Sequence, residues 1–436
     1  MSTFLGKVLC ALVPNIPADF GSGESLVEDV CVPSPPAVGR RQGLKLHLRV
    51  ALSSFFLTSI LFSVPLSPAC AEDPLTLHFA GFAEGGEASQ AATAFPYTNE
   101  ILKLPSVVPA VNVLDSALTS ERLSSDRLTV TTDSSSDSST DPLALAFVLT
   151  WENLAQDPVP DGYKVTADLR AEAMIFDFHS KKLIAAFPFG KQVRTLFTHQ
   201  PSEDEKRGLF LAMYTAPGDN IFDQFASVLQ SADVRRSYGL YAQITSVALD
   251  DRATSSIRNL GVAVNDTQLR SFIAGAFEAS LTKNLGIPLI PSEIGQAIGG
   301  KMTARFANGD VYDISLPKPD YQIQLTLRGF KKVVVGENDV ETVFAFANFF
   351  HIAVIQPLRG QPYLDADLKY AVTKTLPAGI QANSDWASYQ ESMLSFLEDL
   401  SRQFQTPDPE WAAKWAGSAD ISDQFSAAGT ALSKCR

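Results

Sequence analysis

The stretch "YKVTADLRAEA" (Tyr163–Ala173) sets the fold class, because its side chains alternate between apolar and polar. A period of two indicates a β-strand with one buried face and one face in water, which is typical of antiparallel sheets. The next residues, "DFHSKK", have the composition of a turn, and residues 183–196 are apolar enough to form a returning strand. The sequence therefore predicts a long β-hairpin whose polar side chains, such as Asp168, Arg170 and Glu172, face solvent.

Helical signals follow this hairpin. Ser202 and Glu205 have the spacing of a capping box, in which a hydroxyl and a carboxylate satisfy free amides at a helix start. Asp266 caps a second predicted helix, and "IPLIP" (residues 287–291) then predicts a short buried strand. The apolar face of that helix contains Leu269, Phe272, Ile273, Ala276, Phe277 and Leu281.

Three further strands are predicted at Tyr321–Val335, Val340–Gln356 and Leu364–Thr373, and an amphipathic helix follows near Trp386–Leu400. Neighbouring strands joined by short turns form a meander, and the helices alternate with these blocks of strands. The expected fold class is α+β, with antiparallel sheets and amphipathic helices packed on one side. No internal sequence repeat is evident.

A leader precedes the predicted domains. Residues 40–49 are basic, residues 50–66 are apolar, and Ala69-Cys70-Ala71 places small residues where signal peptidase requires them. We expect cleavage after Ala71 and a periplasmic location, with outer-membrane association as the alternative.

Two other outcomes at the leader stay open: lipid attachment to Cys70, and an uncleaved anchor. The sequence "RRQGLK" (residues 40–45) also leaves open export by the twin-arginine route rather than the general one. The expected organisation is a leader at 1–71, an N-terminal α+β region at 72–250 with a Ser/Asp-rich loop at 133–141, and a C-terminal α+β region at 251–436.

The chain is acidic, with a formal net charge of −13. Cleavage after Ala71 removes nearly equal numbers of acidic and basic residues, so the mature chain stays acidic. Such a charge disfavours nucleic acid and anionic lipid surfaces as partners, because both are bound by basic patches. Only Cys435 remains after cleavage, so no internal disulfide is possible, and we expect this cysteine to be a loose terminal thiol.

No motif with a strong catalytic mechanism is present: the sequence has no phosphate loop, nucleophile elbow or His-Glu-x-x-His pair. The histidines are scattered, and His351 lies in an apolar run that predicts a hydrogen-bonded core position. We therefore expect no cofactor, no metal and no catalytic residue, and we favour a protein that is not an enzyme.

Two sets of residues are candidates for ligand or ion binding. Phe344, Phe346 and Phe350 are able to line a pocket for an apolar or lipid-like ligand, although core packing is the alternative. Asp365 and Asp367 share one face of a strand and are able to act as paired carboxylates or to hold a cation. The alternative for them is a solvated sheet face beside Lys369.

One arrangement resembles a known family. A helix with "FIAGAFEASLTKNLG" leads into "IPLIP", and "KPDYQIQLTLRGF" later opens a pair of strands. This layout is similar to the TolB N-terminal-like domain of envelope accessory proteins, such as curli-secretion components and activators of penicillin-binding proteins. The resemblance covers about residues 266–373 and implies a non-catalytic role, namely binding a protein partner in envelope assembly or secretion. The alternatives are a periplasmic solute- or lipid-binding protein and a hydrolase without a recognisable motif. The sequence leaves the oligomeric state open.

Overall fold

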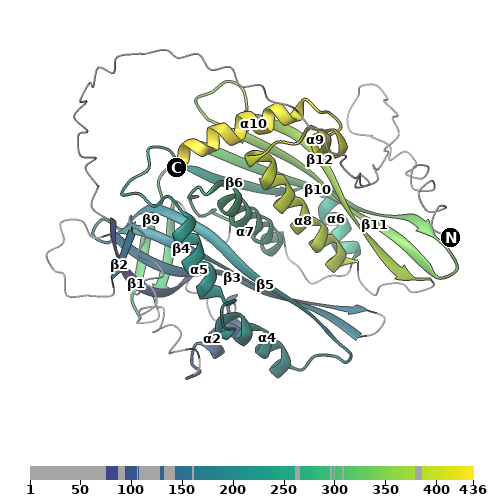
Figure 1. Cartoon of the computed structure of the whole chain (residues 1–436), viewed down its shortest axis with the longest axis horizontal. Coiled ribbons are helices and arrows are strands. Elements are labelled where there is room, and N and C mark those ends of the chain that lie inside the picture. The colour runs from purple at the N-terminus through teal and green to yellow at the C-terminus, as the bar shows by residue number, and fades with distance from the viewer. Residues whose placement is uncertain are drawn as a thin grey trace, which may run out of the picture. The chain divides into compact units, whose positions relative to one another are not determined.

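A computed structural model of the chain describes the following residues: 75–86, 94–105, 107, 128–131, 143–159, 162–260, 266–294, 297–298, 300–306, 309–378 and 385–436 (Figure 1). The chain divides into the units Met1–Asp73 and Pro74–Arg436, and the described residues belong to the second. Ala69, Ala71 and the loop at 133–141 lie outside the described residues. The boundary expected at residue 250 stays a prediction.

Among the described residues, eight strands form the first sheet, in the order β2-β1-β3-β4-β5-β9-β8-β7. Their bounds are β1 Leu75–Gly85, β2 Leu128–Thr131, β3 Leu143–Val159, β4 Gly162–Asp177, β5 Lys182–Phe197, β7 Ala297–Ile298, β8 Lys301–Phe306 and β9 Val311–Ser315. Strand β8 also pairs with β1, so the sheet closes on itself. The closure is narrow at β5, which meets β9 at Lys182 alone.

A second sheet of four strands has the order β12-β11-β10-β6. The bounds of these strands are β6 Ala242–Leu249, β10 Tyr321–Glu337, β11 Glu341–Ile355 and β12 Leu364–Pro377. The segment 287–291 joins the two sheets: the Leu289 amide donates to the Ala186 carbonyl of β5, and the Ile290 amide donates to the Ala242 carbonyl of β6, both at 2.9 Å.

The two sheets share one topology. In the first, β1 lies parallel to β3, which opens the antiparallel meander β3-β4-β5. In the second, β6 lies parallel to β10, which opens the meander β10-β11-β12. Helices follow each meander along the chain. The described part of the chain therefore repeats one architectural plan, although its sequence shows no repeat.

The helices cover the sheets as separate layers (Figure 1). Their bounds are α2 Pro96–Ile101, α4 Glu203–Thr215, α5 Ile221–Ser231, α6 Asp251–Asn259, α7 Asp266–Leu285, α8 Trp386–Gln405, α9 Pro409–Ala416 and α10 Ile421–Leu432, with a 3₁₀ turn at Ser433–Cys435. The capping box predicted at Ser202 and Glu205 is present at the start of α4. Cys435 is fully buried, so the expected loose terminal thiol is wrong.

Helices α4 and α5 pack on one face of the first sheet, over a core that includes Phe147, Phe187 and Phe225. Helices α8 and α10 pack on one face of the second sheet, over a core that includes Phe350 and Phe396. Helix α7 contacts β5, β6 and α8, so it is enclosed by both halves of the fold. Its buried set therefore extends beyond the predicted apolar face to Ala274, Gly275 and Glu278.

The α+β fold class is confirmed, but two finer expectations are corrected. The sheets are mixed rather than antiparallel, because β1 and β6 each add a parallel strand. The polar face of β4 is not solvated, since Asp168, Arg170 and Glu172 are 5%, 6% and 1% exposed. Helix α7 covers this face, so the first sheet carries helices on both sides.

Candidate binding site

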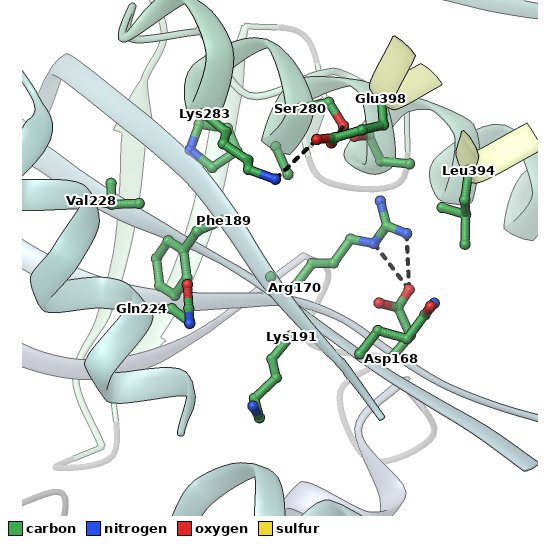
Figure 2. A pocket seen from close by; sticks show the side chains of 15 residues that line it. Asp168, Arg170, Phe189, Lys191, Gln224, Val228, Ser280, Lys283, Leu394 and Glu398 are labelled. Carbon is green, nitrogen blue, oxygen red and sulfur yellow. Dashed lines mark hydrogen bonds and ion pairs between the residues drawn. The ribbon is translucent and has the colours of Figure 1, made fainter. Parts of the chain in front are cut away.

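A cavity of about 280 Å³ lies between strands β4 and β5 and helices α5, α7 and α8 (Figure 2). The residues that line it are Asp168, Arg170, Pro188, Phe189, Gly190, Lys191, Gln192, Gln224, Val228, Ala276, Ala279, Ser280, Lys283, Leu394 and Glu398. Each half of the fold supplies part of the wall: α5 and the hairpin come from the first, and α7 and α8 from the second. The volume is close to the lower end of ligand pockets, and both polar and apolar side chains line it.

The cavity follows the outer edge of β5. Pro188 faces Glu172 across the β4–β5 ladder, and a proline has no amide hydrogen to donate to β4. In an antiparallel pair, residues whose backbone groups point toward the partner alternate with residues whose groups point away. The Ala186 carbonyl does point away from β4, because it accepts from Leu289. The same alternation directs the amide and carbonyl groups of Gly190 and Gln192 outward, toward the cavity.

This edge is open. Among the described residues, β5 pairs with a strand on its outer side at Lys182 alone. Gly190 is exposed, and its partner across the ladder is Arg170. A sheet edge with unpaired amide and carbonyl groups is able to template another strand.

An ion pair forms one wall of the cavity. The Arg170 Nε and Nη2 atoms donate to Asp168 Oδ2 at 3.1 and 2.9 Å, and both side chains are 7% exposed. Two glycines make room for the arginine: a Cβ on Gly190 would lie 3.2 Å from Arg170 Cγ, and a Cβ on Gly275 would lie 3.4 Å from Arg170 Cδ. The guanidinium also lies over the Phe272 ring, with Cζ 5.2 Å from the ring centroid. The packing therefore holds the guanidinium in one place.

Other charges lie at the mouth. Lys283 of α7 pairs with Glu398 of α8 at 2.9 Å, and Ser280 donates to the same carboxylate at 3.3 Å (Figure 2). Lys191 of β5 is 11% exposed and pairs at 2.6 Å with Asp219, which is 73% exposed. The cavity thus offers both donors and acceptors near the open strand edge.

Two buried acids continue this face of β4 and α7 beyond Arg170. Both oxygens of Glu172 lack a hydrogen-bond partner among the described residues, and burial raises the pKa of Glu172 well above its ordinary range, with repulsion from Glu278 adding to the effect. Glu278 is also buried and accepts from the Ser292 amide at 3.0 Å. Burial raises the pKa of Glu278 to about 7, and the Ser292 hydrogen bond and the Arg170 charge oppose this shift. Such an acid pair is able to hold protons at neutral pH.

The structure places the three predicted phenylalanines elsewhere. Phe346 and Phe350 are buried in the second core, where Phe346 contacts Tyr389 and Phe350 stacks on Phe396. Phe344 is partly buried at the rim of the same core. None of the three lines the cavity.

Asp365 and Asp367 lie on the opposite, exposed face of the second sheet. His351 Nδ1 is 2.9 Å from Asp367 Oδ1, and its Nε2 is 3.5 Å from Asp365 Oδ1. Arg328 also pairs with Asp367. The core position expected for His351 is wrong, because its side chain is 36% exposed on this face. Among the described residues, no group of three His, Cys, Asp or Glu side chains is arranged to hold a metal ion.

The double substitution Asp365→Asn, Asp367→Asn is expected to change the free energy of unfolding by about 1 kcal/mol or less, because exposed ion pairs are screened by solvent. Thermal melts with and without Ca²⁺, Mg²⁺ or Zn²⁺ measure this. A melting temperature that a cation raises in the parent, but not in the double variant, would identify a cation site here instead.

Sequence reasoning missed the residues that do line the cavity. Period two shows which side chains of β4 share a face, but it does not show what covers that face. One signal was available in "FIAGAFEA" (residues 272–279), because small or apolar residues surround most of this helix rather than forming one stripe. A helix of that kind is buried on several sides, so it has to cover a second surface.

Among the helices of the described part, none has the length and apolar character needed to cross a membrane. A scan against protein-family models finds no match. A search of curated proteins also finds no relative.

Proposed function

We propose that the protein is an exported, non-catalytic binding protein that captures an extended segment of a partner polypeptide at the outer edge of β5. The observation that carries this proposal is the open strand edge at Gly190 and Gln192, which lies inside a cavity rather than on a bare surface. Strand addition of this kind uses main-chain hydrogen bonds for affinity and flanking pockets for specificity.

The walls of the cavity suit an added strand. Alternate side chains of an extended segment point to opposite sides. One side would meet Phe189 and Val228, and the other would meet Ala276 and Leu394. The cavity volume fits a few residues of a chain and is small for a lipid, which disfavours the lipid-binding alternative.

The charged side chains at the mouth of the cavity indicate which kind of partner segment it would prefer. Lys191 and Lys283 lie on either side of β5, and their carboxylate partners Asp219 and Glu398 come from the flanking loop and from α8. A partner segment that carries acidic residues, or that ends in a free carboxylate, would displace Asp219 or Glu398 and pair with the lysine in its place. This proposal agrees with a role among envelope proteins after export, which the leader at 1–71 predicts.

Replacing Gln192 with proline removes the outward amide while keeping the β4–β5 ladder. The preceding residue of a proline favours an extended conformation, which Lys191 already has, and prolines occur at strand edges. We expect peptides selected from a random displayed library against the purified chain to bind Gln192→Pro at least about tenfold more weakly, equivalent to about 1.4 kcal/mol. Fluorescence anisotropy with a labelled selected peptide measures the affinity.

The matched control is Gln192→Ala, which removes the side chain but keeps the amide, and it should bind nearly as well as the parent. Ala279→Trp, which fills the cavity, should also lose binding, whereas Ala413→Trp on the exposed face of α9 should not. Equal affinity for Gln192→Pro and Gln192→Ala would exclude strand addition.

A small solute with a carboxylate is the second candidate, and the fixed Arg170 guanidinium at the cavity wall favours it. The same variants separate the two ligands. Binding of a small solute would be abolished by Ala279→Trp, which fills the cavity, but would survive Gln192→Pro, because a solute does not need the amide groups of the strand edge.

A further inference from the structure

Three basic side chains from three strands converge on one carboxylate of α8, and none of these four side chains lines the cavity. Lys164 Nζ of β4 and Lys374 Nζ of β12 lie 3.0 and 2.6 Å from the same oxygen, Glu391 Oε2. Arg194 of β5 reaches the other oxygen, Oε1, at 3.9 Å. We call these four residues the Glu391 cluster. It joins the outer part of the first hairpin to the outer part of the second sheet.

Positive charge exceeds negative charge in the Glu391 cluster. Three cations share one carboxylate in a chain whose net charge is −13. The pKa of Lys374 is lowered chiefly by burial, and repulsion from Lys164 and Arg194 adds to the effect of burial. The pKa of Glu391 falls to about 2 despite burial, because Lys374 and Lys164 donate hydrogen bonds to it. A single carboxylate therefore does not neutralise the three basic side chains, and the cluster keeps a net positive charge.

The cluster is reachable from solvent without being fully hydrated. The side chains of Lys164 and Lys374 are each 24% exposed, that of Glu391 is 30% exposed and that of Arg194 is 41% exposed. Partial burial strengthens electrostatic attraction relative to bulk water. Arg194 has the longest contact to Glu391, so its guanidinium is the one best placed to turn toward an added anion.

We propose that the Glu391 cluster is a binding site for a phosphate-type oxyanion, with Lys164, Arg194 and Lys374 as its ligands and Glu391 as the internal anion that competes for them. A tetrahedral oxyanion has several oxygens, so it is able to engage three donors at once, as the two oxygens of Glu391 already do. By contrast, Lys332 of β10 is held by a carboxylate of its own, Asp385 at 2.8 Å, and lies over the rings of Phe344 and Phe346.

The cluster also has a structural reading, in which Glu391 only clamps the two sheets together. That reading accounts for one cation and one carboxylate, whereas here three cations have gathered. The two readings differ in what removal of the carboxylate does. If Glu391 is only a clamp, its removal weakens the contact between the two sheets and creates no anion binding. If the cluster is an oxyanion site, removal of Glu391 takes away the competing carboxylate and raises the affinity for phosphate.

Calorimetric titration with sodium phosphate, at an ionic strength balanced with sodium chloride, tests the proposal. The full-length protein should bind one phosphate with saturating heat, Glu391→Gln should bind it about tenfold more tightly, and Arg194→Met at least about fivefold more weakly. The matched control is Glu100→Gln, because Glu100 is also a carboxylate paired with a basic side chain, Arg207, but belongs to neither the Glu391 cluster nor the cavity, and it should leave phosphate affinity unchanged.

Flotation with phosphatidylglycerol vesicles asks whether the phosphate group belongs to a lipid. The acidity of the chain favours the free ion, and flotation that depends on Arg194 would assign the headgroup instead. Two results would overturn the proposal. In the first, neither the parent nor Glu391→Gln gives saturable heat with phosphate, and neither protein floats with the vesicles. In the second, Arg194→Met binds phosphate as tightly as the parent does. The Arg194→Met result stands even if Glu391→Gln fails to fold.

Discussion

Gly429→Ala is expected to destabilise the protein by about 3 kcal/mol or more, because α10 and α8 touch through their backbones at this residue. A Cβ on Gly429 would lie 2.9 Å from the carbonyl carbon and 3.3 Å from the Cα of Phe404, and it would overlap the carbonyl oxygen. A side chain can rotate away from such a contact, but a helix backbone cannot. The whole of α10 would have to move, and its own side chains Phe425 and Leu432 would be pulled out of the core.

The matched control is Gly208→Ala. Gly208 is also inside a helix, but it is exposed, and a Cβ there would have nothing within 4 Å. Alanine should therefore stabilise α4 by about 0.5–1 kcal/mol through its higher helix propensity. Urea unfolding followed by circular dichroism measures both variants. Equal midpoints for Gly429→Ala and the parent would show that α8 and α10 do not pack this closely.

Much of the secondary structure could be predicted because local pattern determines it. The hairpin predicted from Tyr163–Ala173 is β4 and β5, and the predicted meander is β10, β11 and β12. The helix predicted after Asp266 is α7. Each prediction rests on periodicity, caps or turn composition, which act over a few residues.

The arrangement of these elements could not be predicted in the same way. β1 and β6 join their sheets in parallel, through long connections that leave no local signal. The cavity was missed for the same reason, since it needs α7 to cover a face of β4 nearly a hundred residues earlier in the chain. The site candidates chosen from sequence, Phe346 and Asp367 among them, were selected by local composition, and the structure does not bring them to the cavity.

The covered face of β4 has a consequence for stability. Glu172 and Glu278 are each 1% exposed, and Glu278 has a pKa of about 7 in the folded protein against 4.5 ordinarily. The pKa of Glu172 is raised as well. A carboxyl whose folded pKa is raised stabilises the fold fully below its unfolded pKa, and this contribution is lost as the pH rises through the folded pKa.

We therefore expect the free energy of unfolding to fall between about pH 5 and pH 8, by about 3 kcal/mol for Glu278 alone. Glu278→Gln replaces the acid with an amide that stays neutral and is still able to accept from the Ser292 amide. This variant should be close to the parent at pH 5, and more stable than the parent at pH 8. Urea unfolding at intervals across this range measures the difference.

The control for this substitution is Glu293→Gln, which changes an exposed glutamate one residue from Ser292 and should follow the parent at every pH. The range of pH matters, because the lowered pKa values of Glu391 and Asp367 act in the opposite direction at more acidic pH. Restricting the comparison to pH 5–8 leaves out those two groups. Burial also raises the pKa values of Glu84 and Glu152, but these acids are present in the parent and in Glu278→Gln, so the difference between the two proteins reports on Glu278. If the parent and Glu278→Gln lose stability in parallel as the pH rises, Glu278 is ionised throughout, and α7 does not seal this face of β4 from water.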